Sequence, residues 1–478
     1  MNNTLKGIQP EKVMYFFEKL TEIPRGSGNE KKVSNYLVEF AKKRDLEVKQ
    51  DDSLNVIIKK KGNIESNKRV ILQGHMDIVC AKQENKEFDF ENDPIDIYVD
   101  GDMIKAKGTT LGGDNGIAVA MGLAILDSND IKHSDLTVLV TTEEETGMGG
   151  VLGLQKDSID GDILINIDSE EEGKILASCA GGVRSNLLLP ISFEKNSFKN
   201  SYKIKIDGLL GGHSGMEIDK RRGSSIKIMG RILRYLSLFI DFSISNISGG
   251  EKMNAIAKRC SVDISTDEEK KLKDKLTEIK DRIISEYNSS DPNLDISINK
   301  INLDKKVINQ KNLNDLINIL RLIPQNIQTM SADMEGLVES SSNVGVINLK
   351  DKKIELNSAI RSSVKSLKNE ITDRIDILAN SFNAKHELVA DYPSWKFEKK
   401  SSIRDLMKKV YKEKYNKELE VEAIHAGLEC GFLKEKLGDI DMVSLGPNLY
   451  DVHTPDEKLS ISSTKRVYEF LLDVLKEI

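Results

Sequence analysis

Three short apolar runs constrain the fold of this 478-residue chain more than any other feature of its sequence. The runs Arg69–Gln73, Leu136–Thr141 and Ile163–Ile167 are rich in β-branched residues, and a histidine or carboxylate side chain follows each of them within two residues. Runs of this kind are typical of central strands, and in a parallel sheet the carboxyl ends of such strands meet at one edge. The sequence therefore predicts a sheet with reactive side chains gathered at one edge.

Helical segments surround these runs. Gly116–Leu126, between the first two runs, is apolar on nearly every face, which is typical of a helix buried against a sheet. Helical periodicity also marks Pro10–Leu20 and Glu30–Lys43. Strand, helix and strand in this order predict an α/β domain whose mostly parallel sheet carries helices on both faces.

The pattern changes from about Asn186 onward. Tyr202–Ile206 alternates like a half-buried strand, Ser224–Ile240 has the period of an amphipathic helix, and Asn343–Leu356 is typical of two strands joined by a turn. These features predict an α+β lid, with helices on one face of its strands, inserted into the first domain. Within it, the polar stretches Asp304–Asn314 and Glu339–Asn343 are expected to be mobile.

The end of the chain returns to the first pattern. Helical periodicity over Ser401–Tyr415 and Thr464–Ile478 flanks a strand-like segment at Met442–Leu445. We therefore expect a first domain built from residues 1–186 and 391–478, and an inserted lid or dimerisation domain of residues 187–390.

The composition excludes several classes of protein. Hydrophobic residues make up 39% and charged residues 31% of the chain, a balance typical of a folded globular protein. The net charge of −7 and the scattered lysines argue against a nucleic-acid partner. The sequence has neither a secretory signal nor a long apolar run, so we expect a cytoplasmic protein with no membrane partner. The four cysteines are far apart, which argues against a disulfide framework or a thiolate zinc site.

Two histidine and aspartate motifs are candidates for binding metal. His75 lies two residues after the end of the first run, and Asp77 lies two residues further on, where it can accept a hydrogen bond from the ring nitrogen that does not bind metal. Asp114 lies in a glycine-rich turn, and its two oxygens could bridge two cations. Each motif alone is weak evidence, because glycine-rich turns with aspartate are common.

Further carboxylates and a histidine complete the candidate site. Glu143, Glu144 and Glu145 follow the second run, where three like charges cost stability unless a cation neutralises them; a solvated turn is the alternative. Asp168 follows the third run, and His453 lies in a loop near the end of the chain. Such a mixture of imidazole and carboxylate ligands suits zinc, with manganese or cobalt as alternatives.

The motifs together resemble a known family. GHMD, TTLGGDNGIA, TTEEETGMGG, INIDSEEEG, CAGG, GGHSG, HAGLECG and HTPDE are similar to motifs of the aminoacylase–carnosinase superfamily of dinuclear metallopeptidases. Within that superfamily, the chain resembles the bacterial aminoacyl-histidine dipeptidases, also called Xaa-His dipeptidases or peptidase D, over nearly its whole length. The first domain would then be the catalytic one.

The resemblance implies a role for each candidate residue of the first domain. His75 and Asp168 would bind one ion, Glu145 and His453 a second, and Asp114 would bridge the two ions. Glu144 would be the general base, which leaves Glu143 outside the ligand set. Each subunit would hold two divalent ions, zinc first among them.

The resemblance also implies substrate-binding residues in the lid. His213, in the motif GGHSG, would stabilise the oxyanion, from its own subunit or from the partner of a homodimer. Asn254 and Arg361 would bind substrate, since an arginine offers a planar fork for a carboxylate. Each could instead be an ordinary polar residue of the lid. His425 and Glu429 match the motif HAGLECG but gain no role from their chemistry.

The expected activity is hydrolysis of Xaa-His and other unsubstituted dipeptides by a metal-activated water. One alternative is a related tripeptidase or N-acyl-amino-acid deacylase. An alternative of a different class is a non-catalytic binding protein on the same fold, although the presence of Glu144 and all five ligands argues against it.

Overall fold

A computed structural model describes residues 3–302 and 305–478 of the chain. Its internal contacts divide it into two compact units. The first unit comprises Met1–Ser178, Phe397–Ala423 and Leu428–Ile478, and the second comprises Cys179–Lys396 and Ile424–Gly427. The domain boundaries expected at 186/187 and 390/391 fall within two strands of the second unit, β9 (Gly181–Pro190) and β21 (Lys385–Tyr392), and remain a prediction.

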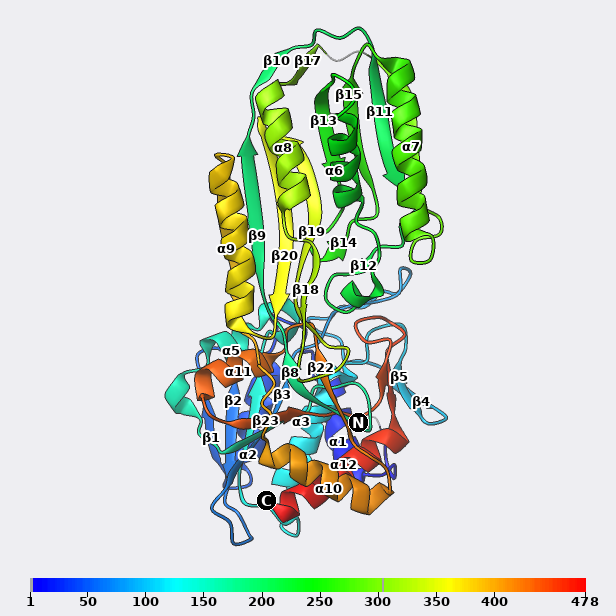
Figure 1. The fold of residues 1–478 in the computed structure, drawn as a ribbon. Helices are drawn as coiled ribbons and strands as arrows, with labels where there is room; N and C mark the ends of the chain where they lie inside the picture. The colour runs from blue at the N-terminus through cyan, green and yellow to red at the C-terminus, as the bar shows by residue number, and fades with distance from the viewer. Residues whose placement is uncertain (1–2, 303–304) are drawn as a thin grey trace. The chain divides into compact units, whose positions relative to one another are not determined.

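An eight-stranded sheet in the order β1-β2-β6-β3-β7-β23-β8-β22 forms the centre of the first unit (Figure 1). The four neighbours β6, β3, β7 and β23 are parallel, whereas β1, β2 and β8 pair antiparallel. The strands are β1 (Glu47–Gln50), β2 (Val56–Lys60), β3 (Arg69–His75), β6 (Asp135–Thr141), β7 (Ile163–Asn166), β8 (Lys174–Cys179), β22 (Glu420–Ile424) and β23 (Asp441–Ser444). The three apolar runs of the sequence are thus the parallel neighbours β3, β6 and β7, as predicted.

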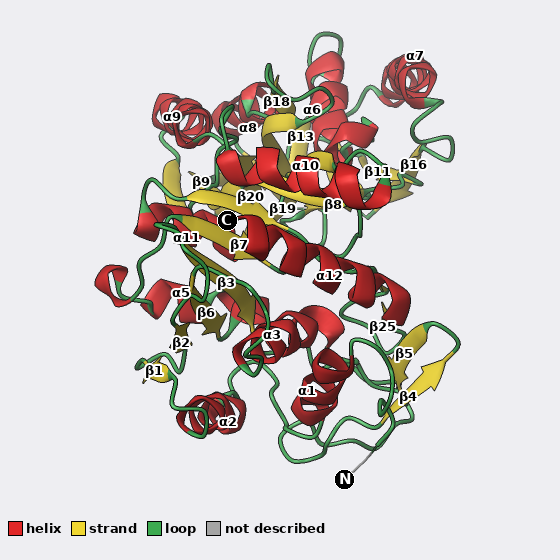
Figure 2. Ribbon diagram, turned by 90° about the horizontal axis from the view of Figure 1, so that it is seen from below, coloured by secondary structure: helices red, strands yellow, loops and turns green. Residues whose placement is uncertain are grey.

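Helices cover both faces of this sheet, which confirms the predicted fold class (Figure 2). On one face, alternate strand residues such as Val70 and Leu72 share one core with α1 (Glu11–Thr21), α2 (Lys31–Lys42), α3 (Gly113–Leu126), α10 (Ser402–Tyr415) and α12 (Ile461–Glu477). The short helices α5 (Gly149–Gly153) and α11 (Glu429–Leu437) contact each other on the opposite face. The helix α3 is buried nearly all round, as its uniform apolar sequence predicted.

Smaller elements complete the first unit. A four-stranded sheet has the order β24-β25-β5-β4. The remaining elements are β4 (Ile97–Asp100), β5 (Met103–Ala106), α4 (Glu144–Gly147), β24 (Leu449–Tyr450) and β25 (Lys458–Ser460).

An antiparallel sheet in the order β16-β11-β15-β13-β19-β20-β9-β21, with β18 paired to β19, forms the second unit. One core joins its inner strand residues to four helices, so the unit has the two layers expected of an α+β insertion. Its main elements besides β9 and β21 are β11 (Ser201–Asp207), α6 (Ser225–Leu236), β13 (Ser243–Gly249), β15 (Cys260–Ser265), α7 (Glu269–Tyr287), β16 (Asp295–Ile301), α8 (Gln310–Leu322), β18 (Asn326–Met330), β19 (Val338–Lys350), β20 (Lys353–Ser362) and α9 (Lys365–Ser381).

In the first stretch expected to be mobile, Asp304 lies outside the described residues, β17 (Lys306–Ile308) forms a strand, and α8 begins at Gln310. The expectation that Glu339–Asn343 is mobile was wrong. These residues form part of β19, and Ser340 to Asn343 are at most 1% exposed. The hydroxyl of Ser340 hydrogen-bonds to that of Thr329 at 2.5 Å, and the hydroxyl of Ser341 lies 2.7 Å from His425 Nε2. A polar run can fill a buried strand when its side chains find partners, and the sequence alone does not reveal such partners.

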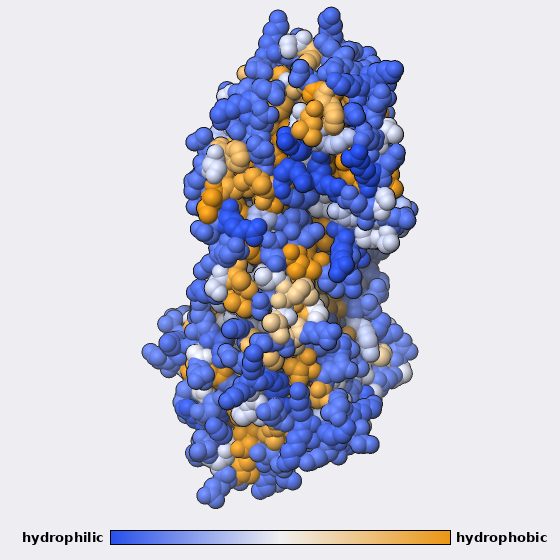
Figure 3. All heavy atoms as spheres, in the orientation of Figure 1, coloured by the Kyte–Doolittle hydropathy of each residue, from blue (hydrophilic) through white to orange (hydrophobic). Residues whose placement is uncertain are grey.

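On the face drawn in Figure 3 most of the surface is hydrophilic, with apolar side chains in scattered patches. Such patches are normal, because polar groups alone cannot cover a folded protein. Within the described part of the chain, no helix is both long enough and apolar enough to span a membrane.

Candidate metal centre

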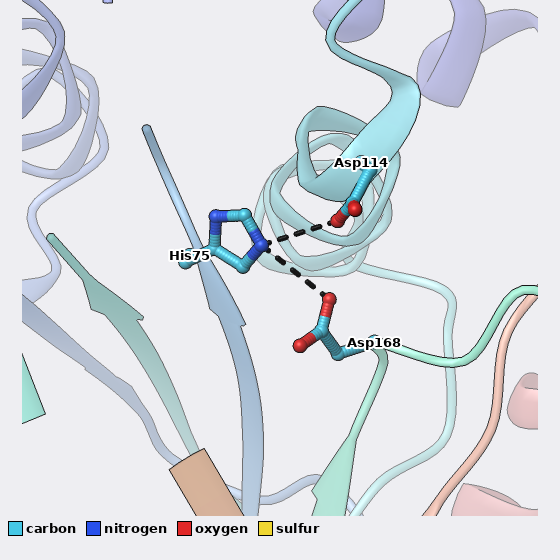
Figure 4. Close-up of side chains that lie close together, drawn as sticks. All are labelled: His75, Asp114 and Asp168. Carbon is cyan, nitrogen blue, oxygen red and sulfur yellow. Dashed lines mark hydrogen bonds and ion pairs between the residues drawn. The ribbon is translucent and has the colours of Figure 1, made fainter. Parts of the chain in front are cut away.

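Three of the expected ligands converge from separate elements of the first unit (Figure 4). His75 is the last residue of β3, Asp168 follows β7, and Asp114 lies in the first turn of α3, where the backbone is not yet helical. The Nε2 atom of His75 lies 3.2 Å from Asp114 Oδ1 and 3.5 Å from Asp168 Oδ1. The parallel strands β3 and β7 thus bring His75 and Asp168 to the same edge of the sheet.

The other two expected ligands meet the opposite oxygen of Asp114. His453 Nε2 lies 3.1 Å from Asp114 Oδ2 and 3.0 Å from Glu145 Oε1. The two oxygens of Asp114 therefore face two different histidines, which is the arrangement expected of a carboxylate that bridges two ions.

The donor atoms fit two cations. The ligand atoms of His75, Asp114 and Asp168 lie within 4.8 Å of one another, and the same holds for Asp114, Glu145 and His453. Each group combines one imidazole with two carboxylates, a donor set that zinc accepts. Asp114 belongs to both groups, so a pair of ions could be held close together.

The electrostatics of the site also favour cations. Burial alone would lower the pKa of His75, but Asp168, Asp114 and Asp77 outweigh it and raise the pKa well above its usual value. Hydrogen bonds to Asp114 and Glu145 raise the pKa of His453 to about 11. Burial raises the pKa of Asp168 to about 6, although His75 opposes the shift. The carboxylates thus crowd enough negative charge together to attract any available positive charge.

Asp77 has more contacts than the sequence predicted. Its Oδ1 lies 3.4 Å from His75 Nδ1, as expected of a group that orients the ring. Its two oxygens also accept the backbone N–H groups of Glu144, at 3.1 Å, and Glu145, at 3.2 Å, and the hydroxyl of Ser27, at 2.8 Å. The fully buried Asp77 therefore holds both His75 and the start of α4.

The three consecutive glutamates have different environments. Glu144 and Glu145 form a third group of potential ligands with His75, whereas Glu143 is exposed and belongs to none of the groups found among the described residues. Burial raises the pKa of Glu144 well above its usual value; His75 opposes the shift, and the carboxylates of Asp168 and Glu429 add to it. The backbone N–H of Glu143 instead donates to Glu30 Oε1.

Comparison with known proteins identifies the family of the chain. Residues 71–477 match the sequence pattern of peptidase family M20/M25/M40, which is most of the chain. The chain belongs to this peptidase family. The expected resemblance is confirmed, and so is the expectation of an enzyme that hydrolyses peptide bonds.

Two relatives of this peptidase match it over nearly their full length. The cytosol non-specific dipeptidase of Escherichia coli (strain K12) is 35% identical over 480 residues, which cover 99% of both proteins. The crystal structure of aminoacylhistidine dipeptidase from Vibrio alginolyticus has a TM-score of 0.96 and 34% identity, and the match covers 99% of this chain and 98% of that one. A tripeptidase from Staphylococcus aureus is 16% identical, with a TM-score of 0.56 over 98% of each chain, and shares the fold alone.

The expected substrate-binding residues all lie in the second unit. His213 Nδ1 accepts the N–H groups of Gly215, at 3.3 Å, and Met216, at 3.1 Å. Arg361, on β20, donates from Nη1 to the hydroxyl of Tyr392 at 3.0 Å. Asn254 lies exposed in a turn between β13 and β14 (Ala255–Ile256).

The motif HAGLECG contributes to both units of the peptidase. His425 belongs to the second unit, where Ser341 is its partner. Glu429 belongs to the first unit, where its buried Oε2 accepts from Gln73 at 2.6 Å and from Thr141 at 2.7 Å. Burial raises the pKa of Glu429 to about 7.

Sequence reasoning missed two residues that support the ligand loops. Glu457 accepts four backbone N–H groups of residues 111–114 at 2.8 to 3.2 Å, and so holds the loop that carries Asp114. The buried Arg25 donates to the carbonyl of Met76 at 2.8 Å and to that of Gly112 at 2.7 Å. Glu457 lies four residues after His453, in the motif HTPDE, and this proximity was the signal available in the sequence.

Proposed function

We propose that this chain is a dipeptidase that hydrolyses Xaa-His and other unsubstituted dipeptides with two divalent metal ions. The observation that carries the proposal is the carboxylate of Asp114, whose two oxygens face His75 and His453. The names of the two full-length relatives, a non-specific dipeptidase and an aminoacylhistidine dipeptidase, support the substrate class.

The proposed ligands follow from the two groups of donor atoms. His75 and Asp168 hold one ion, Glu145 and His453 hold the other, and Asp114 holds both. Zinc is the metal that this donor set fits best, with manganese or cobalt as alternatives. When bound, the two ions supply a water of lowered pKa and polarise the carbonyl of the scissile bond.

Glu144 is the proposed general base. Its carboxylate is part of the third donor group, with His75 and Glu145, so it lies beside proposed ligands of both ions. Asp77 holds the backbone N–H of Glu144 and so fixes the start of the helix that carries this carboxylate. Glu144 takes the proton of the attacking water and returns it to the leaving amine.

His213 is the proposed donor to the oxyanion. Because its Nδ1 accepts two backbone N–H groups, the proton of the neutral ring lies on Nε2, which is then free to donate. Burial lowers the pKa of His213, and the nearby Arg361 lowers it further, so the ring is neutral at pH 7. The oxyanion that it contacts belongs to the substrate of its own subunit or to that of the partner in a homodimer.

Arg361 and Asn254 are the proposed binding residues for the C-terminal half of the substrate. The guanidinium of Arg361 has a neutral partner, the hydroxyl of Tyr392, and its Nε is buried without a hydrogen-bond partner among the described residues. Because this partner is neutral, Arg361 can bind a carboxylate without first breaking an ion pair with it. The buried Asn343 donates to the carbonyls of Met253 and Ala255 and so holds the turn of Asn254.

A cytoplasmic location is part of the proposal, and it rests on the name of the relative from Escherichia coli. A substrate panel tests the function as a whole. The purified protein should cleave free dipeptides such as Gly-His faster than tripeptides and N-acetylated amino acids. Preference for tripeptides would favour a tripeptidase, and preference for N-acyl amino acids would favour a deacylase. No cleavage of any of them by the metal-loaded protein would favour a binding protein.

A further inference from the structure

The guanidinium of Arg361 acts electrostatically on three neighbours in the second unit, His213, His425 and Tyr392. Burial and the nearby Arg361 lower the pKa of His213, and they lower the pKa of His425 to about 3. Both imidazoles are therefore neutral at pH 7. The nearby Glu217 pairs with Arg222 at 2.9 Å. Such a group favours binding of an anion.

Tyr392 fits closely into this group. A Cβ atom on Gly182 would lie 2.4 Å from the hydroxyl oxygen of Tyr392, and one on Gly427 would lie 2.8 Å from Cε2 of its ring. These two glycines therefore leave the space that the ring fills. Lys368 Nζ donates to the backbone carbonyl of Tyr392 at 3.0 Å and holds the residue in place.

The O–H group of Tyr392 can still donate a hydrogen bond. Its oxygen accepts the hydrogen bond from Arg361 Nη1, so its own proton must point elsewhere. Burial raises the pKa of Tyr392, which keeps that proton on the oxygen at neutral pH. A carboxylate has two oxygens, and a guanidinium beside a phenolic hydroxyl offers donors to both.

We propose that Tyr392 is a substrate-binding residue that orients Arg361 and donates its own hydrogen bond to the C-terminal carboxylate of the dipeptide. This inference rests on the proposed dipeptidase function. Arg361 and Tyr392 together bind the free carboxylate, and this contact selects unsubstituted dipeptides.

The kinetic test uses Tyr392→Phe, which keeps the ring between the two glycines and removes only the hydroxyl. On Gly-His, kcat/KM should fall by about tenfold or more, mainly through KM, because a hydrogen bond to a charged group is lost. On Gly-His amide, the variant and the wild type should agree within about twofold. In an Arg361→Ala background the same substitution should have little further effect. Equal losses on both substrates, or no loss on either, would overturn the inference.

A binding measurement separates this inference from the proposed function. In a Glu144→Gln background, calorimetric titration with Gly-His and with its amide measures affinity without turnover. In this background, Tyr392→Phe should weaken binding of the free dipeptide and leave binding of the amide unchanged. Equal effects on both ligands would refute the role of Tyr392. If the wild type binds Gly-His in this way but does not cleave it, the dipeptidase proposal fails, and only the carboxylate-binding role of Tyr392 remains.

Tyr235→Phe is the matched control. Tyr235 lies on α6 of the same unit, and its hydroxyl interacts with Glu278 instead of Arg361. Loss of this hydroxyl should leave both substrates unaffected. The melting temperatures of both variants show whether the fold is intact.

Discussion

At the scale of single residues, the neighbours Glu143 and Glu144 differ in environment and not in chemistry. Glu144 lies among the potential ligands, whereas Glu143 is exposed and outside them. Glu144→Gln should therefore keep its metal and lose about 10²- to 10⁴-fold in kcat, the range typical of a general acid or base. Glu143→Gln should keep nearly full activity. Steady-state kinetics with metal analysis by emission spectroscopy checks both, and the reverse pattern would shift the assignment by one residue.

A second prediction at this scale concerns pH. Burial, together with Arg361, lowers the pKa of His425 to about 3 from its usual 6.5. Below about pH 6.5 the unfolded chain therefore binds a proton on His425, whereas the folded chain does not. The neutral ring contributes stability above that pH, and this stability is lost as the pH falls.

The expected size of this effect is up to about 1.4 kcal/mol for each pH unit between about 6 and 4. As the pH falls over that range, the free energy of unfolding should decrease less for His425→Gln than for the wild type. Urea denaturation at several pH values measures both. Parallel curves for the two proteins would show that His425 titrates normally.

At the scale of elements, Glu457 links the loop of His453 to the loop of Asp114. One carboxylate accepts four N–H groups, and an amide could not accept them all because its nitrogen is a donor. Glu457→Gln should therefore weaken metal binding by about 10- to 100-fold, as typically found for groups that position ligands. Competition with a zinc-binding dye measures this affinity.

The control for this variant is Glu469→Gln, on the exposed side of α12, where the carboxylate lies 3.9 Å from Lys465. It should bind zinc like the wild type. Unchanged affinity in Glu457→Gln would mean that the other contacts of the loop suffice to place Asp114.

The elements of the first unit could largely be predicted because their signals are local. β3, β6 and β7 are continuous apolar runs, and the residues that follow a parallel strand must lie at its carboxyl end, which placed His75, Glu145 and Asp168 together. The strand β19 was missed at Ser340 to Ser342, because partners of its polar side chains, such as His425, are distant in sequence.

The residues that support the ligand loops could not be predicted for the same reason. Glu457 binds a loop more than 340 positions earlier in the chain, and Arg25 reaches carbonyls 51 and 87 positions away. Apart from the place of Glu457 in the motif HTPDE, nothing in the sequence around either residue indicates its burial or its partners. Contacts of this range become visible only in the folded chain.

At the scale of the whole molecule, the proposed function gives the two units separate tasks. The first unit carries the potential metal ligands, and the second carries His213, Arg361 and Tyr392. The proposed dipeptidase thus depends on chemistry from one unit and substrate selection from the other. Its central claim is that the reaction needs the metal that the first unit would bind.

Removal and return of metal test that claim most directly. The protein is stripped with a chelator, dialysed free of it, and titrated with zinc while hydrolysis of Gly-His and bound zinc are both followed. Activity should vanish in the stripped protein and return in proportion to bound metal, reaching its maximum at two equivalents per chain, with manganese or cobalt as substitutes. Full activity in the metal-free protein would contradict the account, and a maximum at one equivalent would contradict the role of Asp114 as a bridge.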